Sequence, residues 1–120
     1  MRINPTTLTE LQQVTDSPVV IADNKGLITY VNSCFQEVLG WTQQDLLGKL
    51  ITTLLPEEFR DSHNLAFSRF QFTEKATVLN HPLKLKTITK DRQEIITEHY
   101  IIAEKTADGW AFGAILKPLT

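Results

Sequence analysis

Disulfides, membrane spans and secretion signals are all missing from this chain. Its 120 residues include one cysteine, Cys34, so no internal disulfide can form, which is typical of a reducing compartment. No apolar run approaches the roughly 18–20 residues that cross a bilayer, and residues 1–5 lack the apolar core of a signal peptide. We therefore expect a cytoplasmic protein with no membrane contact by this segment.

An excess of charge and the common catalytic motifs are missing too. The 12 basic and 14 acidic side chains give a formal net charge of −2. Nucleic-acid binders normally show a basic excess or stripe, so we expect no nucleic-acid partner. Zinc-type Cys/His clusters, P-loops and nucleophile elbows are absent, so we expect no enzymatic activity from this domain itself. The length and the 42% of hydrophobic residues suit one globular domain.

Helices are indicated by capping residues and by helical spacing. Leu8, Leu11 and Val14 form an apolar stripe after a T-x-x-E capping pattern, which indicates a short N-terminal helix. We expect this stripe to be buried against a second protomer or against the chain's own sheet, because an apolar stripe left in water gains nothing on folding. Further helices are predicted to start at residues that suit helix N-termini, namely Asn32, Thr42 and Pro56.

Strands are indicated by runs of β-branched and aromatic residues. The predicted strands are residues 19–22, 27–31, 83–89, 94–104 and 110–116. They come in two separate runs with most of the helices between them, which predicts an α+β fold. We expect a five-stranded antiparallel sheet with helices packed on one face and a short N-terminal helix.

Two neighbouring segments resemble the PAS family. Residues 28–35, ITYVNSCF, and 39–49, LGWTQQDLLGK, follow the family pattern V-N-x-A-F and then G-[YW]-[ST]-x-x-[ED]-L-[IL]-G. One position departs from this pattern: Cys34 stands where alanine is usual. Further along the chain the Lys-Asp pair at residues 90–91 also matches the family, but Arg92 stands where glycine usually follows it. The resemblance extends over nearly all of residues 17–120.

The PAS resemblance implies a role in signal transduction. PAS domains are sensory modules of bacterial signalling proteins, and their interiors either hold a cofactor or are filled by side chains. The resemblance implies a capping or dimerisation helix at residues 1–16, a PAS domain at residues 17–120 and a homodimer. It also implies one module of a longer regulator, covalently attached to an output domain such as a kinase, cyclase or phosphodiesterase.

His63 is the residue that raises the question of haem. Helical spacing places it with Phe67 and Phe70 on the apolar face of the helix that starts at Pro56. Such a histidine is either a core residue bonded to a backbone carbonyl or an axial ligand of haem iron. Residues 55–63, LPEEFRDSH, resemble the haem-PAS group, the FixL oxygen-sensor kinases and the direct oxygen sensor phosphodiesterase. This resemblance implies His63 as the proximal iron ligand and Arg69 as the partner of a haem propionate.

The opposite wall of such a pocket departs from FixL. Leu83 stands where the FixL kinases have an arginine that contacts oxygen, and His81 stands where the direct oxygen sensor has a methionine ligand. His99 falls on the same alternating strand face as Ile101, where FixL kinases have apolar residues over the haem. The resemblance implies His81 as the distal ligand, His99 as the alternative, and gas or redox sensing as the signal.

Three interpretations stay open at this point. Haem is the leading specific candidate, another small ligand is the second, and a ligand-free dimerisation or protein-interaction module is the third. Flavin is less favoured, because the G-x-N-C-R-F-L-Q pattern of flavin photoreceptors of this fold is absent and Cys34 lies elsewhere. The predicted cofactor-binding residues are His63, Arg69, Phe67, Phe70, Leu83 and Ile101, with His63 and His81 on the iron. We interpret Cys34, Trp41 and Trp110 as packing residues.

Overall fold

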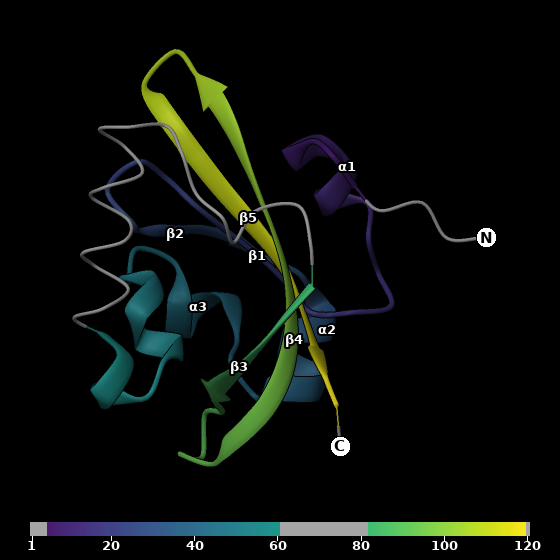
Figure 1. Ribbon diagram of the computed structural model, residues 1–120, viewed down its shortest axis with the longest axis vertical. Coiled ribbons are helices and arrows are strands. Elements are labelled where there is room, and N and C mark those ends of the chain that lie inside the picture. Colours follow the sequence, from purple (N-terminus) through teal and green to yellow (C-terminus); the bar gives the residue numbers. More distant parts are fainter. Residues whose placement is uncertain (1–4, 61–81, 120) are drawn as a thin grey trace.

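The structure is a computed structural model that describes residues 5–60 and 82–119 (Figure 1). Its helices in these ranges are α1 (Leu8–Gln12), α2 (Ser33–Leu39) and α3 (Gln43–Leu46), with the 3-10 turns η1 (Ile51–Leu54) and η2 (Glu57–Phe59). Its strands are β1 (Val19–Ala22), β2 (Ile28–Val31), β3 (Pro82–Ile88), β4 (Glu94–Thr106) and β5 (Gly109–Pro118).

The five strands form one antiparallel sheet in the order β2-β1-β5-β4-β3. This confirms the predicted α+β fold with a five-stranded antiparallel sheet. The last two strands are longer than predicted, because pairing continues until Thr106 faces Gly109 across a two-residue turn. β3 lies at one edge of the sheet, and its Lys84 and Lys86 are exposed there.

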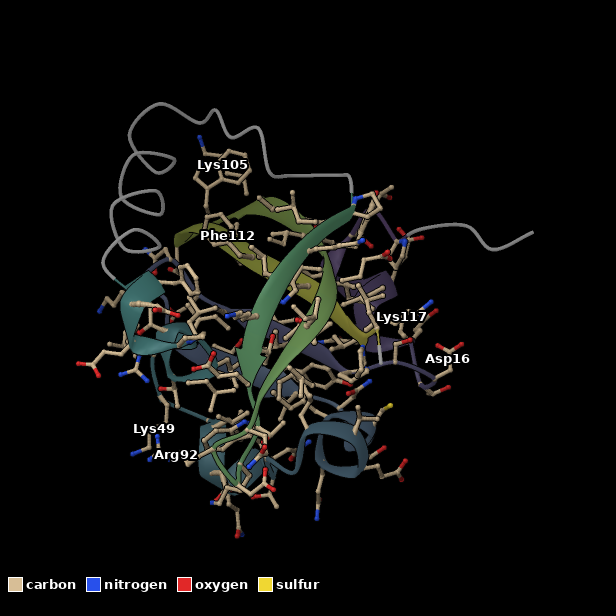
Figure 2. The ribbon with its side chains drawn as sticks, turned by 60° about the horizontal axis from the view of Figure 1, so that its bottom comes forward. Asp16, Lys49, Arg92, Lys105, Phe112 and Lys117 are labelled. Carbon is tan, nitrogen blue, oxygen red and sulfur yellow. The ribbon has the colours of Figure 1, made fainter. Side chains whose placement is uncertain are left out.

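The turn between β3 and β4 forces one residue into an unusual backbone conformation. The Thr89 N–H donates to the Gln93 carbonyl and the Arg92 N–H donates to the Thr89 carbonyl, which closes a three-residue hairpin loop. Arg92 ends this loop with a φ of 69°, in the left-handed region where glycine is favoured. Figure 2 shows its side chain at the surface. The sequence departs here from the glycine usual in PAS domains.

Asn32 ties three parts of the chain together through its side chain. Its Oδ1 accepts hydrogen bonds from the Phe35 N–H at 3.1 Å and from the Val19 N–H at 3.0 Å. Its Nδ2 donates to the Val14 carbonyl at 3.0 Å and to the Ser17 carbonyl at 2.9 Å. The predicted cap of α2 is therefore confirmed, and the same amide also fixes the start of β1 and the segment before it.

The other predicted helix starts are found with one difference in geometry. Thr42 forms a full capping box with Asp45, and Gly40 ends α2 with a φ of 84°. The helix predicted from Pro56 begins with a 3-10 turn at Glu57–Phe59, after which Arg60 has α-helical dihedral angles. The remainder of that predicted helix, and with it the expected cover of the sheet, lies outside the described residues.

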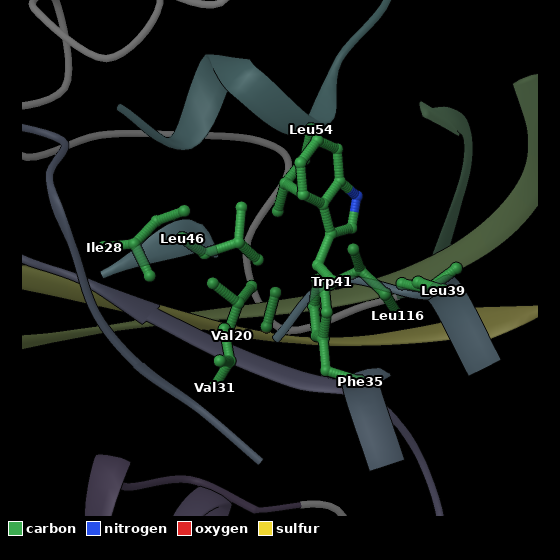
Figure 3. Packing of buried hydrophobic residues seen from close by; sticks show 10 residues of the cluster. Val20, Ile28, Val31, Phe35, Leu39, Trp41, Leu46, Leu54 and Leu116 are labelled. Carbon is green, nitrogen blue, oxygen red and sulfur yellow. The ribbon is translucent and has the colours of Figure 1, made fainter. Parts of the chain in front are cut away.

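The sheet buries apolar side chains on both of its faces. The inner face packs against α2, α3 and η1 through a cluster seen in Figure 3: Val20, Ile28, Val31, Phe35, Leu39, Trp41, Leu46, Leu54, Ala114 and Leu116. The outer face packs against α1, where Leu11 is fully buried with Val19 and Ile102. Leu8 and Val14 lie beside them. Of the two alternatives for the α1 stripe, the structure shows contact with the chain's own sheet.

Candidate functional site

The described part of the candidate site lies on the inner face of β3 and β4. Leu83 faces His99 directly across these strands, and Ile101 follows two residues later on β4. Successive side chains of a strand alternate between faces, so these three share one face. Ile101 packs against the inner cluster, which identifies this face as the inner one. The prediction that His99 shares a face with Ile101 is confirmed.

The other predicted site residues lie outside the described residues: His63, Phe67, Arg69, Phe70 and His81. The structure therefore brings together Leu83, His99 and Ile101 and leaves the proximal side of a haem pocket as a sequence-based prediction.

His99 belongs to a buried polar cluster that the sequence did not reveal. Its Nε2 lies 2.7 Å from the Thr97 hydroxyl oxygen and 3.1 Å from the Thr87 hydroxyl oxygen. These two oxygens lie 2.7 Å apart, and the Thr97 hydroxyl also donates to the Leu85 carbonyl at 3.0 Å. Both threonines are fully buried, and His99 is 6% exposed.

The two threonines escaped sequence analysis because the cluster depends on strand register. Thr97 pairs with Leu85 and Thr87 pairs with Ile95, so the contact between the threonines runs diagonally between neighbouring pairs. The signal that could have found them is the predicted hairpin itself. The turn fixes which residues of the two strands pair, and this register places Thr87, Thr97 and His99 on one face of the hairpin.

Burial sets the charge of the His99 ring. Removal from water lowers the pKa of His99 to about 4, because the charged form loses its hydration. The imidazole is therefore neutral at pH 7. A neutral ring has one nitrogen with a hydrogen and one with a free lone pair, which is the form that accepts hydrogen bonds or binds metal ions.

The residues interpreted as packing residues are found in the interior or half-buried. Trp41 is buried, and its indole N–H donates to the Ile88 carbonyl at 2.9 Å. Lys90 lies with Nζ 5.5 Å from the Trp41 ring centroid and 2.7 Å from Asp45. Cys34 is buried, which raises the pKa of its thiol, and Trp110 is half-buried.

A surface groove lies away from the candidate site. It has a volume of about 630 Å³ and runs between the end of α2 and the β3–β4 turn. Its walls include Val38, Lys90 and Pro118, and of the described site residues neither Leu83 nor His99 nor Ile101 lines it. Within residues 5–60 and 82–119, no group of three acidic, cysteine or histidine side chains is placed to hold a metal ion. In the same ranges, no helix has the length and apolar character to span a membrane.

The fold and the sequence together define the family. The profile of the PAS fold matches residues 7–80, more than half of the chain. The chain therefore belongs to the PAS family, whose members are sensory, regulatory modules of signalling proteins.

Individual relatives are distant. The sensor protein FixL of Bradyrhizobium diazoefficiens is 22% identical over 79 residues, which are 66% of this chain but only 16% of FixL. The PAS domain of a Desulfitobacterium hafniense protein superposes with a TM-score of 0.72 at 19% identity, covering 92% of this chain and 99% of that domain. The PAS domain of the Cronobacter turicensis quorum-sensing receptor RpfR, in complex with BDSF, superposes with a TM-score of 0.67 at 15% identity, covering 90% and 98%.

Proposed function

We propose that this chain is the sensory domain of a bacterial signal-transduction protein and binds a small ligand or cofactor against the inner face of β3 and β4. The domain then passes the signal to a covalently attached output domain, within a cytoplasmic homodimer. The observation that carries the proposal is the buried, neutral imidazole of His99 on a sheet face that also carries the apolar side chains of Leu83 and Ile101. A ligand-binding neighbour of the same fold, RpfR with BDSF, supports it.

Haem is the first candidate for the ligand. The described residues fit one side of a porphyrin, because Leu83 and Ile101 offer apolar surface and His99 offers a neutral imidazole. His63 would hold the iron, Arg69 would pair with a propionate, and Phe67 and Phe70 would complete the apolar wall. When bound, haem supplies an iron centre that responds to gases or to redox state.

The cluster around His99 bears on the choice of distal ligand. The Nε2 of His99 is already engaged by the hydroxyls of Thr87 and Thr97, so iron ligation through that atom would break two hydrogen bonds inside the protein. This disfavours ligation through Nε2 of His99, and His81 stays the first choice for the distal ligand because it stands where the direct oxygen sensor has its methionine ligand. Leu83 has no hydrogen to donate, so an arginine-type contact to a gas ligand cannot form at that position.

An absorption spectrum of the purified chain, with haem added back, tests the haem assignment. We expect a Soret band in the wild type and in a Lys84→Ala control, which alters an exposed residue of the same hairpin. His63→Ala should lose haem, and His81→Ala should keep haem with one axial ligand fewer and a changed spectrum. Retention of haem by His63→Ala would refute the ligand assignment. A protein that stays colourless with added haem would favour the ligand-free interaction module, and flavin bands would favour flavin.

A further inference from the structure

The hydrogen bonds around His99 determine which ring nitrogen carries the proton. Four contacts join Thr87, Thr97, His99 and the Leu85 carbonyl, and each hydroxyl brings a single hydrogen. With a hydrogen on Nε2, three hydrogens are available for the four contacts: one from each hydroxyl and one from the ring. The Thr97 hydroxyl donates to the Leu85 carbonyl, the Thr87 hydroxyl donates to the Thr97 oxygen, and the Nε2–H is shared between the two hydroxyl oxygens.

The other tautomer leaves the cluster short of hydrogens. With the proton on Nδ1, only two hydrogens serve the four contacts. The Nδ1–H would then be a buried donor with no acceptor among the residues that the structure describes. Orphaned buried N–H groups are rarer in proteins than under-satisfied acceptors. The neutral ring therefore carries its proton on Nε2, and Nδ1 holds a free lone pair.

We propose that the Nδ1 atom of His99 is a recognition atom of the ligand chamber, meaning the ligand site proposed above against the inner face of β3 and β4, and accepts a hydrogen bond from an uncharged O–H or N–H group of the ligand. This inference rests on the chamber proposed above. His99 is 6% exposed, and within residues 5–60 and 82–119 no group donates to its Nδ1. A buried acceptor without a donor among these residues is costly, and a ligand that supplies a hydrogen to it gains that free energy on binding.

The surroundings of His99 restrict the chemistry of the ligand. Its neighbours across the two adjacent strands are Leu83 and the buried Leu116, so apart from the two hydroxyls at Nε2 these neighbours are apolar. The contacts of the ring among the described residues are two neutral hydroxyls at Nε2, so the ring presents the lone pair of Nδ1 to the ligand and has no charged partner in these ranges. A carboxylate or phosphate placed against Nδ1 would lose its hydration without a cation in return from the described residues around the ring. An alcohol, a phenol or a ring N–H fits.

The tautomer and the preference for a donor can both be measured on the full chain. Nitrogen NMR of ¹⁵N-histidine-labelled protein should show an unprotonated Nδ1 and a protonated Nε2 for His99. Phenol and anisole are suitable probes, because they have similar shape and only phenol carries an O–H. We expect phenol to shift the Nδ1 resonance and to bind at least about fivefold more tightly than anisole, as expected for one buried hydrogen bond.

Two variants connect the preference to His99. His99→Phe keeps a ring of similar size without nitrogen atoms, and the ratio of anisole to phenol dissociation constants should fall about fivefold in it. Thr97→Val removes the acceptor that holds the Nε2 proton and should lower the same ratio, which keeps the test available if His99→Phe does not fold. Lys84→Ala on the outer face is the matched control and should keep the wild-type ratio.

The outcomes separate this inference from the proposed function. A ratio that is the same in the wild type, His99→Phe and Thr97→Val overturns the role of His99 and leaves the chamber in place. A protonated Nδ1 in the free protein, or a probe bound elsewhere without any shift at His99, overturns it as well. Failure of both probes to bind counts against the chamber itself, and the inference then fails with it.

Discussion

Gly113 allows α1 to lie close to the sheet, and replacing it by alanine should expose this dependence. A Cβ atom at position 113 would fall within 3.0 Å of Leu11 Cδ1 and at 2.9 Å from Leu8 Cδ2, closer than real Cβ contacts. Leu11 is fully buried against Val19 and Ile102, so it has little room to move. Overpacking of this kind costs about 1–3 kcal/mol. We expect Gly113→Ala to lower the free energy of unfolding by that amount.

Urea unfolding of a double-mutant cycle with Leu11→Ala measures the contact directly. Leu11→Ala alone removes a buried side chain and should cost about 2–5 kcal/mol. It also makes space for the new methyl group, so the double variant should be more stable than the sum of the single effects predicts, by about 1 kcal/mol or more. Strict additivity, or a Gly113→Ala variant as stable as the wild type, would show that α1 does not pack on β5 in this way.

Three further perturbations test the turn, an ion pair and the buried histidine. Arg92→Gly should raise the free energy of unfolding by about 1 kcal/mol, because Arg92 has a φ of 69° that glycine adopts without strain, whereas Arg92→Ala should bring no such gain. The Lys90 ammonium holds the pKa of Asp45 at about 2. The ion pair therefore contributes stability above pH 4, and this contribution is lost as the pH falls toward 2. Asp45→Asn should make the stability–pH curve flatter between pH 4 and pH 2. Burial lowers the pKa of His99 from 6.5 to about 4, so the unfolded chain takes up this proton at a higher pH than the folded protein does. The free energy of unfolding should therefore decrease as the pH falls from 6.5 to 4. His99→Phe should remove this pH dependence.

The fold was accessible from sequence because its signals are local. Asn32 and Thr42 mark helix starts through side chains that bond within three residues, and the strand runs identify themselves by composition. The ends of β4 and β5 were missed because pairing across a hairpin can extend strands into residues of low strand propensity. The turn at Glu57–Phe59 was predicted as α-helical, since proline at a helix start does not distinguish α from 3-10 geometry.

The candidate site was only partly accessible. Alternation alone placed His99 and Ile101 on one face, because the period of a strand is two. The hydroxyls that bind His99 come from diagonal neighbours on two strands, so their contact follows from register and not from any local pattern. The second role of Asn32, its bonds to Val14 and Ser17, was hidden for the same reason: these partners are 18 and 15 residues away.

Asn32 connects parts of the chain that lie on opposite sides of the sheet. Its single amide group holds the first turn of α2 on the inner side of the sheet and the segment that follows α1 on the outer side. The start of α2 and the segment after α1 are therefore held by the same side chain, through hydrogen bonds of 3.1 and 3.0 Å. This connection between the two sides of the sheet runs through one residue and does not use the backbone hydrogen bonds of the strands.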